Sequence, residues 1–155
     1  MLGRMYDSQL CSIARTLEVV GERWTLLIIR DAQLGLRRFE EFQESLGIAR
    51  NVLTSRLSKL VDDGLLDRVC YQERPARYEY RPTDKAQALL TAVLSLMHWG
   101  DEHAADPAGP PRIANHAGCG GSVREQLVCT HCGQVVGPDA VHLLPGPALL
   151  TERQA

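Results

Sequence analysis

The order of turn signals and apolar patterns between Arg38 and Lys85 constrains the fold of this chain more than any other feature. A short amphipathic segment ends at Gly47, a longer one ends at Gly64, and two strand-like runs follow around a charged, proline-containing turn. Glycine tolerates the left-handed backbone that ends many helices, so these glycines separate two helices from each other and from a hairpin. Helix, turn, helix and hairpin is the layout of a winged helix-turn-helix, in which one helix enters a DNA groove.

Apolar periodicity predicts five helices and two strands in the first two thirds of the chain. We expect helices at residues 10–20, 22–33, 39–46, 50–63 and 84–105, and strands at 65–71 and 78–82. Ile48 fills the turn between the third and fourth helices, Thr83 is placed to cap the fifth helix, and residues 72–77 form the wing tip. The expected fold is therefore mainly α with a small β wing.

Charge supports a nucleic-acid partner only through its local distribution. The 155 residues carry a formal net charge of −2, which argues against a globally basic nucleic-acid protein. Basic residues still gather without acids between Arg50 and Leu60, and four arginines accompany two glutamates between Arg68 and Arg81. The sequence contains no phosphate-binding loop, paired carboxylates or Ser–His–Asp set, so we expect no enzyme.

The N-terminal residues lack the apolar run of a signal peptide, and no later segment approaches the length of a membrane span. We therefore expect a cytoplasmic protein without a membrane partner. In that compartment the five cysteines should stay reduced, which favours metal binding or redox chemistry over structural disulfides.

The predicted fourth helix carries most of the residues that we expect to contact DNA. With Leu53, Leu57 and Leu60 facing inward, the outward arc is polar and has small side chains. Arg bonds guanine and Asn bonds adenine bidentately, whereas Ser and Thr contact bases or phosphates less selectively. A solvated helix face could have the same composition, but the flanking helix and hairpin favour DNA. The expected DNA-binding residues are Arg38, Arg50, Asn51, Thr54, Ser55, Ser58, Lys59 and, at the wing tip, Arg74 and Arg77.

The predicted fifth helix is apolar on more than one side. Leu89, Leu90 and Val93 mark one side, and Leu94, Leu96 and Trp99 extend the apolar surface to others. One face can pack on the domain, while the other needs a partner or a larger core. Because few other elements are available to cover it, we expect a homodimer.

The chain changes character after the helical region. Residues 1–105 are expected to form the winged-helix and dimerisation domain, 106–112 a linker rich in Pro and Gly, and 113–155 a cysteine-rich segment with an irregular tail. The cysteine-rich part has two short β-prone runs.

Four potential metal ligands occur in that segment as two pairs, each with two intervening residues. His116, Cys119, Cys129 and Cys132 could enclose a tetrahedral zinc ion in a zinc-ribbon-like β segment. Three thiolates and one imidazole would make a closed structural site that stabilises a segment with few apolar residues. His131 competes as the fourth ligand, although its place inside the second pair would strain the chelate. A redox dithiol or unliganded thiols are the alternatives.

An ordered series of motifs resembles the HxlR-type winged-helix transcriptional regulators. The series comprises Cys11, VVGERWTLLIIRDAQLGLRRFEEFQESL, Ile48, LTSRLSKLVDDGLLDR, Pro75 in the wing, YEYRPTDKAQAL and HWGDEH. The resemblance spans Cys11 to about His103, roughly three fifths of the chain. Departures from the family pattern are Ser12, Arg81-Pro82 and Asp84, and none lies in the DNA-reading helix.

The resemblance implies a homodimeric transcriptional regulator bound to a near-palindromic operator in double-stranded DNA. We expect it to act as a repressor and to respond to a ligand or oxidant whose identity is unknown. Several members resemble redox or electrophile switches with a cysteine at the start of the first helix, a position that Cys11 matches. A small core residue is the alternative role for Cys11, and Cys70 is expected only to pack. The rival functions are a protein–protein adaptor, or a thiol–disulfide enzyme using Cys129 and Cys132, for which no thioredoxin-like βαβ pattern is present.

Overall fold

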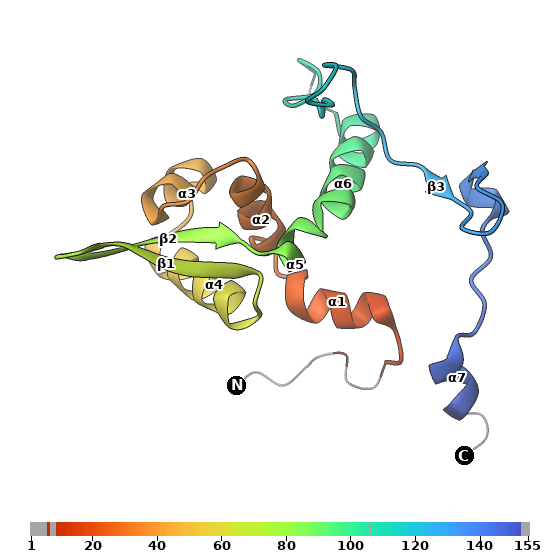
Figure 1. Cartoon of the computed structure of the whole chain (residues 1–155), viewed down its shortest axis with the longest axis horizontal. Helices are drawn as coiled ribbons and strands as arrows, with labels where there is room; N and C mark the ends of the chain where they lie inside the picture. The colour runs from red at the N-terminus through yellow and green to blue at the C-terminus, as the bar shows by residue number, and fades with distance from the viewer. Residues whose placement is uncertain (1–5, 7–8, 106, 153–155) are drawn as a thin grey trace. The chain divides into compact units, whose positions relative to one another are not determined.

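The computed structural model describes residue 6, residues 9–105 and residues 107–152 (Figure 1). Contacts between Cα atoms divide the chain into two compact units, one up to Val93 and one from Leu94 onward. The elements of the first unit are α1 (Ser12–Val20), α2 (Thr25–Gln33), α3 (Phe39–Leu46), α4 (Arg50–Asp62), β1 (Leu66–Glu73), β2 (Ala76–Pro82) and α5 (Asp84–Gln87). Helix α6 (Leu90–His103) begins in the first unit and continues into the second.

The turn between α3 and α4 is built as its sequence predicts. Gly47 has a φ of 61°, and its N–H donates to the carbonyl oxygen of Gln43 at 3.0 Å, which ends α3. Ile48 follows and is buried, while Ala49 is the extended N-cap residue of α4. The two helices are thereby held as a helix-turn-helix pair above one core.

That core is formed by the inner faces of α2, α3 and α4 and the start of the wing. Its largest fully buried side chains are Phe42, Ile28, Ile29, Leu53, Leu57, Leu60, Leu65 and Leu66. The ring of Phe42 also meets that of Tyr80 on β2 edge to face, with centroids 6.5 Å apart. Burial of these aliphatic groups fixes α4 by one face and leaves its other face in solvent.

The wing is a two-stranded antiparallel sheet in which Leu66 pairs with Pro82 and Glu73 pairs with Ala76, with one irregularity between Cys70 and Gln72. Both strands extend further than the sequence pattern predicts, so the tip is a two-residue turn and not the six-residue turn expected at 72–77. The distal residues Gln72, Glu73, Ala76 and Arg77 show no alternation of apolar and polar side chains, yet their backbones still pair. The winged helix-turn-helix prediction is confirmed.

The prediction of one uninterrupted helix over residues 84–105 was wrong. Thr83 accepts a hydrogen bond from the N–H of Ala86 and caps α5, as expected. Helix α5 then ends at Gln87, and the N–H of Leu89 bonds the carbonyl oxygen of Ala86 at 3.1 Å in a tighter turn. Ala86 is fully buried and Leu89 packs against the core, so tertiary packing overrides the helix propensity of the sequence here.

In the second unit, β3 (Leu127–Val128) pairs antiparallel with β4 (Val135–Val136), and the 3-10 turn η1 (Pro138–Ala140) and helix α7 (Pro147–Glu152) follow. The tail expected to be irregular therefore contains two short helical elements. The division into 1–105, 106–112 and 113–155 stays a prediction. In the part of the chain that the structure describes, no helix is both long and apolar enough to cross a membrane.

Candidate nucleic-acid interface

The solvent-facing side of α4 is lined by small polar and basic side chains. Asn51, Thr54, Ser55 and Ser58 are exposed along the helix, opposite the buried leucines. The Thr54 hydroxyl donates to the carbonyl oxygen of Arg50 at 2.9 Å, which turns its oxygen back along the helix. Such a face has few bulky groups that would prevent close approach to a base edge.

Two of the basic residues on α4 are engaged in ion pairs. Lys59 Nζ lies 2.6 Å from the Asp63 carboxylate one turn further along, and Arg56 Nε lies 3.1 Å from Glu22. Both pairs are partly exposed, so their contribution to stability is small, about 0–1 kcal/mol each. Arg56 is thereby directed to the N-terminal side of α2, away from the outward arc of α4.

The first residue of α4 has a different environment. The Arg50 guanidinium carbon lies 4.7 Å from the ring centroid of Phe39, which is the first residue of α3. Arg38 immediately precedes α3, and its guanidinium carbon lies 4.9 Å from the ring centroid of Tyr71 on β1. Stacking on an aromatic face leaves the in-plane N–H groups of a guanidinium free to bond an acceptor, and restricts the side chain in advance.

The wing turn is fixed by a side chain within the wing itself. The Gln72 amide donates to the carbonyl oxygens of Arg74 and Pro75, both at 3.2 Å. Arg74 and Arg77 are exposed beside this turn. Arg68 is further from the turn on β1. Its guanidinium carbon lies 3.6 Å from the ring centroid of Tyr78 on β2, so it contacts the neighbouring strand.

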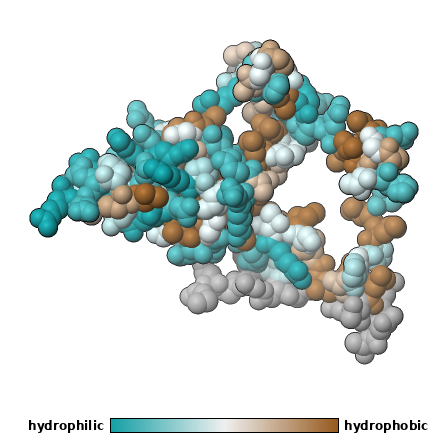
Figure 2. All heavy atoms as spheres, in the orientation of Figure 1, coloured by the Kyte–Doolittle hydropathy of each residue, from teal (hydrophilic) through white to brown (hydrophobic). Residues whose placement is uncertain are grey.

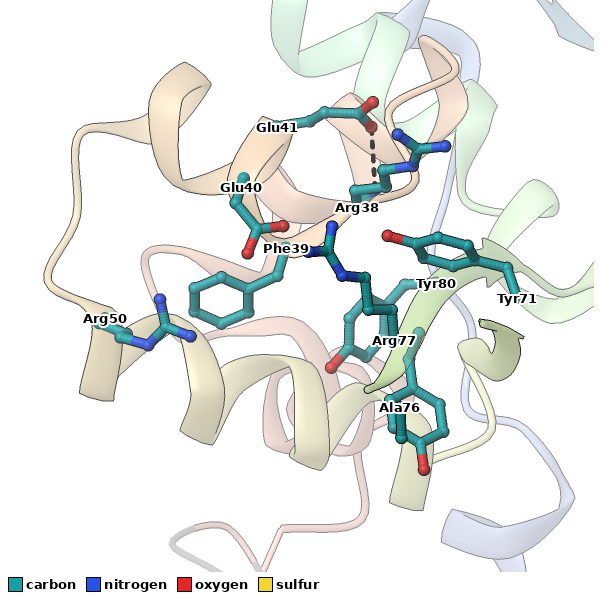
Figure 3. A pocket seen from close by; sticks show the side chains of 10 residues that line it. Arg38, Phe39, Glu40, Glu41, Arg50, Tyr71, Ala76, Arg77 and Tyr80 are labelled. Atoms are coloured by element: carbon teal, nitrogen blue, oxygen red, sulfur yellow. Dashed lines mark hydrogen bonds between the residues drawn. The ribbon is translucent and has the colours of Figure 1, made fainter. Parts of the chain in front are cut away.

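Arg38, Arg50 and Arg77 come together at one hollow of about 690 Å³. The hollow lies between the starts of α3 and α4 and the wing, and is also lined by Tyr71 and Tyr80 (Figure 3). The lining also includes Tyr78 and the carboxylates of Glu40 and Glu41. Its three guanidinium groups and three phenol groups still make the surface rich in donors that suit an anion. The wing and adjoining helices present a mainly hydrophilic surface in Figure 2.

Glu41 also lines this hollow, but its charge is used locally. Its Oε2 accepts the backbone N–H groups of Arg37 at 2.7 Å and Arg38 at 2.9 Å. These two hydrogen bonds, assisted by the nearby arginine charges, hold the pKa of Glu41 below its ordinary value although desolvation opposes them. The carboxylate thus satisfies donors at the start of α3, as the Glu of a capping box does.

Sequence reasoning missed the aromatic supports of the interface. The sequence pattern assigns Phe39 only to a helix and Tyr71 only to a strand, yet the ring of each also supports an arginine. Arg37, by contrast, donates to the carbonyl oxygens of Ala32 at 2.5 Å and Leu36 at 2.8 Å, so it closes the α2–α3 connection. The sequence offers only a weak signal for such stacking, because each arginine and its aromatic partner belong to different elements and are far apart in the chain.

The cysteines are distributed over both units. Cys11 is the partly buried N-cap residue of α1, and the exposed Cys70 donates its S–H to the carbonyl oxygen of Gln72 at 3.2 Å. In the second unit His116 Nδ1 lies 3.2 Å from Cys119 Sγ. Backbone N–H groups of Cys132 and His131, with the Cys132 side chain, hold the pKa of the Cys129 thiol below its ordinary value.

The two predicted ligand pairs are formed as separate turns. Among the described residues, no three His, Cys, Asp or Glu side chains gather as a group that could hold a metal ion. The zinc site, and with it the zinc-ribbon-like nature of the segment, stays a prediction.

Residues 19–107 match the HxlR-like helix-turn-helix family. The HTH-type transcriptional regulator Rv3095 of Mycobacterium tuberculosis is 48% identical over 136 residues, which cover 88% of this chain and 86% of that protein. The crystal structure of PA1607, assigned as a transcription factor, is similar with a TM-score of 0.80 and 34% identity, over 91% of this chain and 99% of that one. The reduced form of the redox regulator HypR is similar with a TM-score of 0.58 and 29% identity, over 61% of this chain and 94% of that one.

Proposed function

The chain belongs to the HxlR-like helix-turn-helix family of transcriptional regulators, and we propose that it recognises a specific double-stranded DNA site by placing α4 in the major groove. The observation that carries this proposal is the pairing of a small, polar, exposed α4 face with an arginine at its first turn that is stacked on Phe39. Arg50 and Asn51 would read base edges, while Thr54, Ser55, Ser58 and Lys59 would add base or phosphate contacts.

The wing and the hollow beside α3 would bind the DNA backbone. Arg38 and Arg77 border the hollow together with Arg50, and Arg74 is exposed at the wing turn. A phosphate group accepts several guanidinium N–H bonds, and such contacts fix the register of a protein on the duplex without reading sequence. The net charge of −2 is then no obstacle, because Arg38, Arg50 and Arg77 are gathered at this hollow.

We propose further that the regulator acts as a homodimer. Helix α6 contains no buried residue among those described, and Trp99 and Leu96 are 61% and 56% exposed. On α1, Ile13 is 68% exposed. Several large apolar side chains exposed to water on α6 and α1 favour association with a second copy. A two-fold symmetric dimer would match a near-palindromic operator.

We propose that the regulator represses transcription by occluding a promoter, and that an oxidant or small molecule is its effector. Cys11 supports it by its place, because it is the N-cap residue of α1 and is only partly buried. The similarity to the redox regulator HypR adds weight to an oxidant as the signal.

The test is selection of bound duplexes from a random-sequence pool by the full-length protein. The proposal predicts enrichment of a two-fold related motif whose half-sites lie about one helical turn, or a multiple of it, apart. A variant with Arg50→Ala and Asn51→Ala should enrich nothing. Failure of the unmodified protein to enrich any motif, under both reducing and oxidising conditions, would reject the proposal.

A protein–protein adaptor is the competing function, and the near-neutral net charge is the observation that favours it. An adaptor would bind random and selected duplexes equally and weakly. It would also have no use for stacked arginines on both sides of a hollow, which is why DNA binding is preferred.

A further inference from the structure

The turn that holds His116 and Cys119 is closed by a set of backbone hydrogen bonds. The N–H of His116 donates to the carbonyl oxygen of Gly121, and the N–H of Gly120 donates to the carbonyl oxygen of His116, both at 2.8 Å. Just outside these bonds, Asn115 and Ser122 form an isolated antiparallel bridge. The turn is therefore the end of a minimal hairpin.

The turn that holds Cys129 and Cys132 repeats this pattern position by position. The N–H of Cys129 donates to the carbonyl oxygen of Gln134 at 2.9 Å, and the N–H of Gly133 donates to the carbonyl oxygen of Cys129 at 2.8 Å. Val128 and Val135 then pair as part of β3 and β4. Counted from the first residue of each pair, the same positions donate, accept and bridge in both turns.

The glycines after the second member of each pair have the same backbone conformation. Gly120 follows Cys119 and Gly133 follows Cys132, and both have a φ of 72°, a left-handed value that other residues rarely adopt. The two segments thus share their hydrogen bonds, their strand register and the φ of the glycine in the Cys-Gly step. Apart from the Cys-Gly step the two sequences differ, so the common geometry points to a common chemical task for the paired side chains.

Each turn already brings its two side chains together. His116 Nδ1 lies 3.2 Å from Cys119 Sγ, and the Cys132 side chain is a hydrogen-bond partner of Cys129. Glycine at position 118 leaves room for the imidazole, because a Cβ there would lie 3.0 Å from His116 Cε1. Each turn therefore holds its own two N or S ligand atoms close together, as each half of a tetrahedral zinc site must.

We propose that one Zn²⁺ ion per chain binds His116, Cys119, Cys129 and Cys132 and joins the two turns into a single module. Both turns belong to the unit that begins at Leu94, and nine residues separate Cys119 from Cys129. Binding releases three thiol protons to solvent, and the ion is held by three thiolates and a neutral imidazole. With no open position, the site is structural and supplies no catalysis.

The repeated geometry also assigns the fourth ligand. His116 occupies in the first turn the position of Cys129 in the second, and Cys119 occupies that of Cys132. The counterpart of His131 in the first turn is Gly118, which has no side chain to donate. His131 therefore lies inside the turn as an exposed residue and is the matched control for His116.

The experiment is a Zn²⁺ titration of the full-length, reduced, metal-free protein in competition with a chromophoric chelator, repeated with Co²⁺. The variants are His116→Asn, Cys119→Ser and, as the control, His131→Asn. Far-ultraviolet circular dichroism of each variant checks that the helices of the first unit remain folded. We expect one ion per chain for the unmodified protein and for His131→Asn.

His116→Asn should weaken Zn²⁺ binding on the order of 100-fold or more, since even partners outside the ligand set commonly contribute 10–100-fold. Cys119→Ser should remove about one third of the thiolate-to-Co²⁺ charge-transfer absorption. Absence of stoichiometric Zn²⁺ binding by the unmodified protein would overturn the proposal. Equal losses in His116→Asn and His131→Asn, or a Co²⁺ spectrum unaffected by Cys119→Ser, would overturn the ligand assignment.

Discussion

Replacement of Arg50 by Ala should abolish most of the preference for the selected DNA site and should change the stability of the protein only slightly. Arg50 is exposed at the first turn of α4, and its contact inside the molecule is the ring of Phe39. Ala is at least as good a helix former as Arg, and an exposed cation–π contact contributes about 0.5–1 kcal/mol, so the free energy of unfolding should fall by no more than about 1 kcal/mol.

The expected loss of binding free energy depends on how many copies of α4 contact the DNA. A bidentate arginine contact contributes about 1–3 kcal/mol of discrimination between bases. A dimer presents Arg50 twice, and separated positions are roughly additive, so the loss is about 2–6 kcal/mol. The lower bound corresponds to roughly 30-fold in the dissociation constant.

The control is Arg56→Ala on the same helix. It removes the same charge, but from a side chain that is directed to Glu22. Fluorescence anisotropy with a labelled duplex, at one fixed salt concentration, measures both variants. A dissociation constant for Arg50→Ala within threefold of that for Arg56→Ala would refute a base-reading role for Arg50.

Further predictions concern capping, the core, the wing and the dimer. Glu41→Gln should destabilise the fold by about 0.5–1 kcal/mol at pH 7, as measured by urea unfolding. Folding lowers the pKa of Glu41 from its ordinary value of 4.5. The stability difference should therefore disappear as the pH falls below 4.5 and through the pKa of Glu41 in the folded protein. Phe42→Ala should cost about 3–5 kcal/mol in the same assay, since the ring is fully buried, and a smaller loss than about 2 kcal/mol would show that the core closes around the cavity. Arg77→Ala should weaken binding to all duplexes alike and reduce the slope of log affinity against log salt by about 0.9 per protomer, whereas unequal weakening would indicate base contact. Trp99→Glu should shift sedimentation equilibrium toward monomer, and an unchanged mass would exclude α6 from the dimer interface.

The sequence determined the helix-turn-helix pair because its local signals agree with the tertiary packing. Gly47 ends α3 in the left-handed conformation, Ile48 fills the turn, and the leucines of α4 recur at core spacing. The wing strands were predicted too short because residues such as Gln72 and Glu73 pair by backbone alone and leave no alternating pattern.

Other features depend on contacts that no local pattern encodes. The break after α5 occurs among good helix formers because Ala86 and Leu89 pack on the core. The stacking of Arg50 on Phe39 joins two helices, so only the folded chain brings it about. In the cysteine-rich segment the spacing predicts two pairs of metal ligands, which stay a prediction, while the equivalence of the two turns is visible only in their hydrogen bonds.

The most direct test of DNA reading by α4 is a change of sequence preference. Selection from a random duplex pool would be carried out in parallel with the unmodified protein and with Asn51→Arg, which exchanges an adenine-reading for a guanine-reading side chain. We predict that the preferred base changes at one position in each half-site and that the rest of the motif is preserved. An unchanged motif bound at altered affinity would contradict the placement of α4 in the major groove.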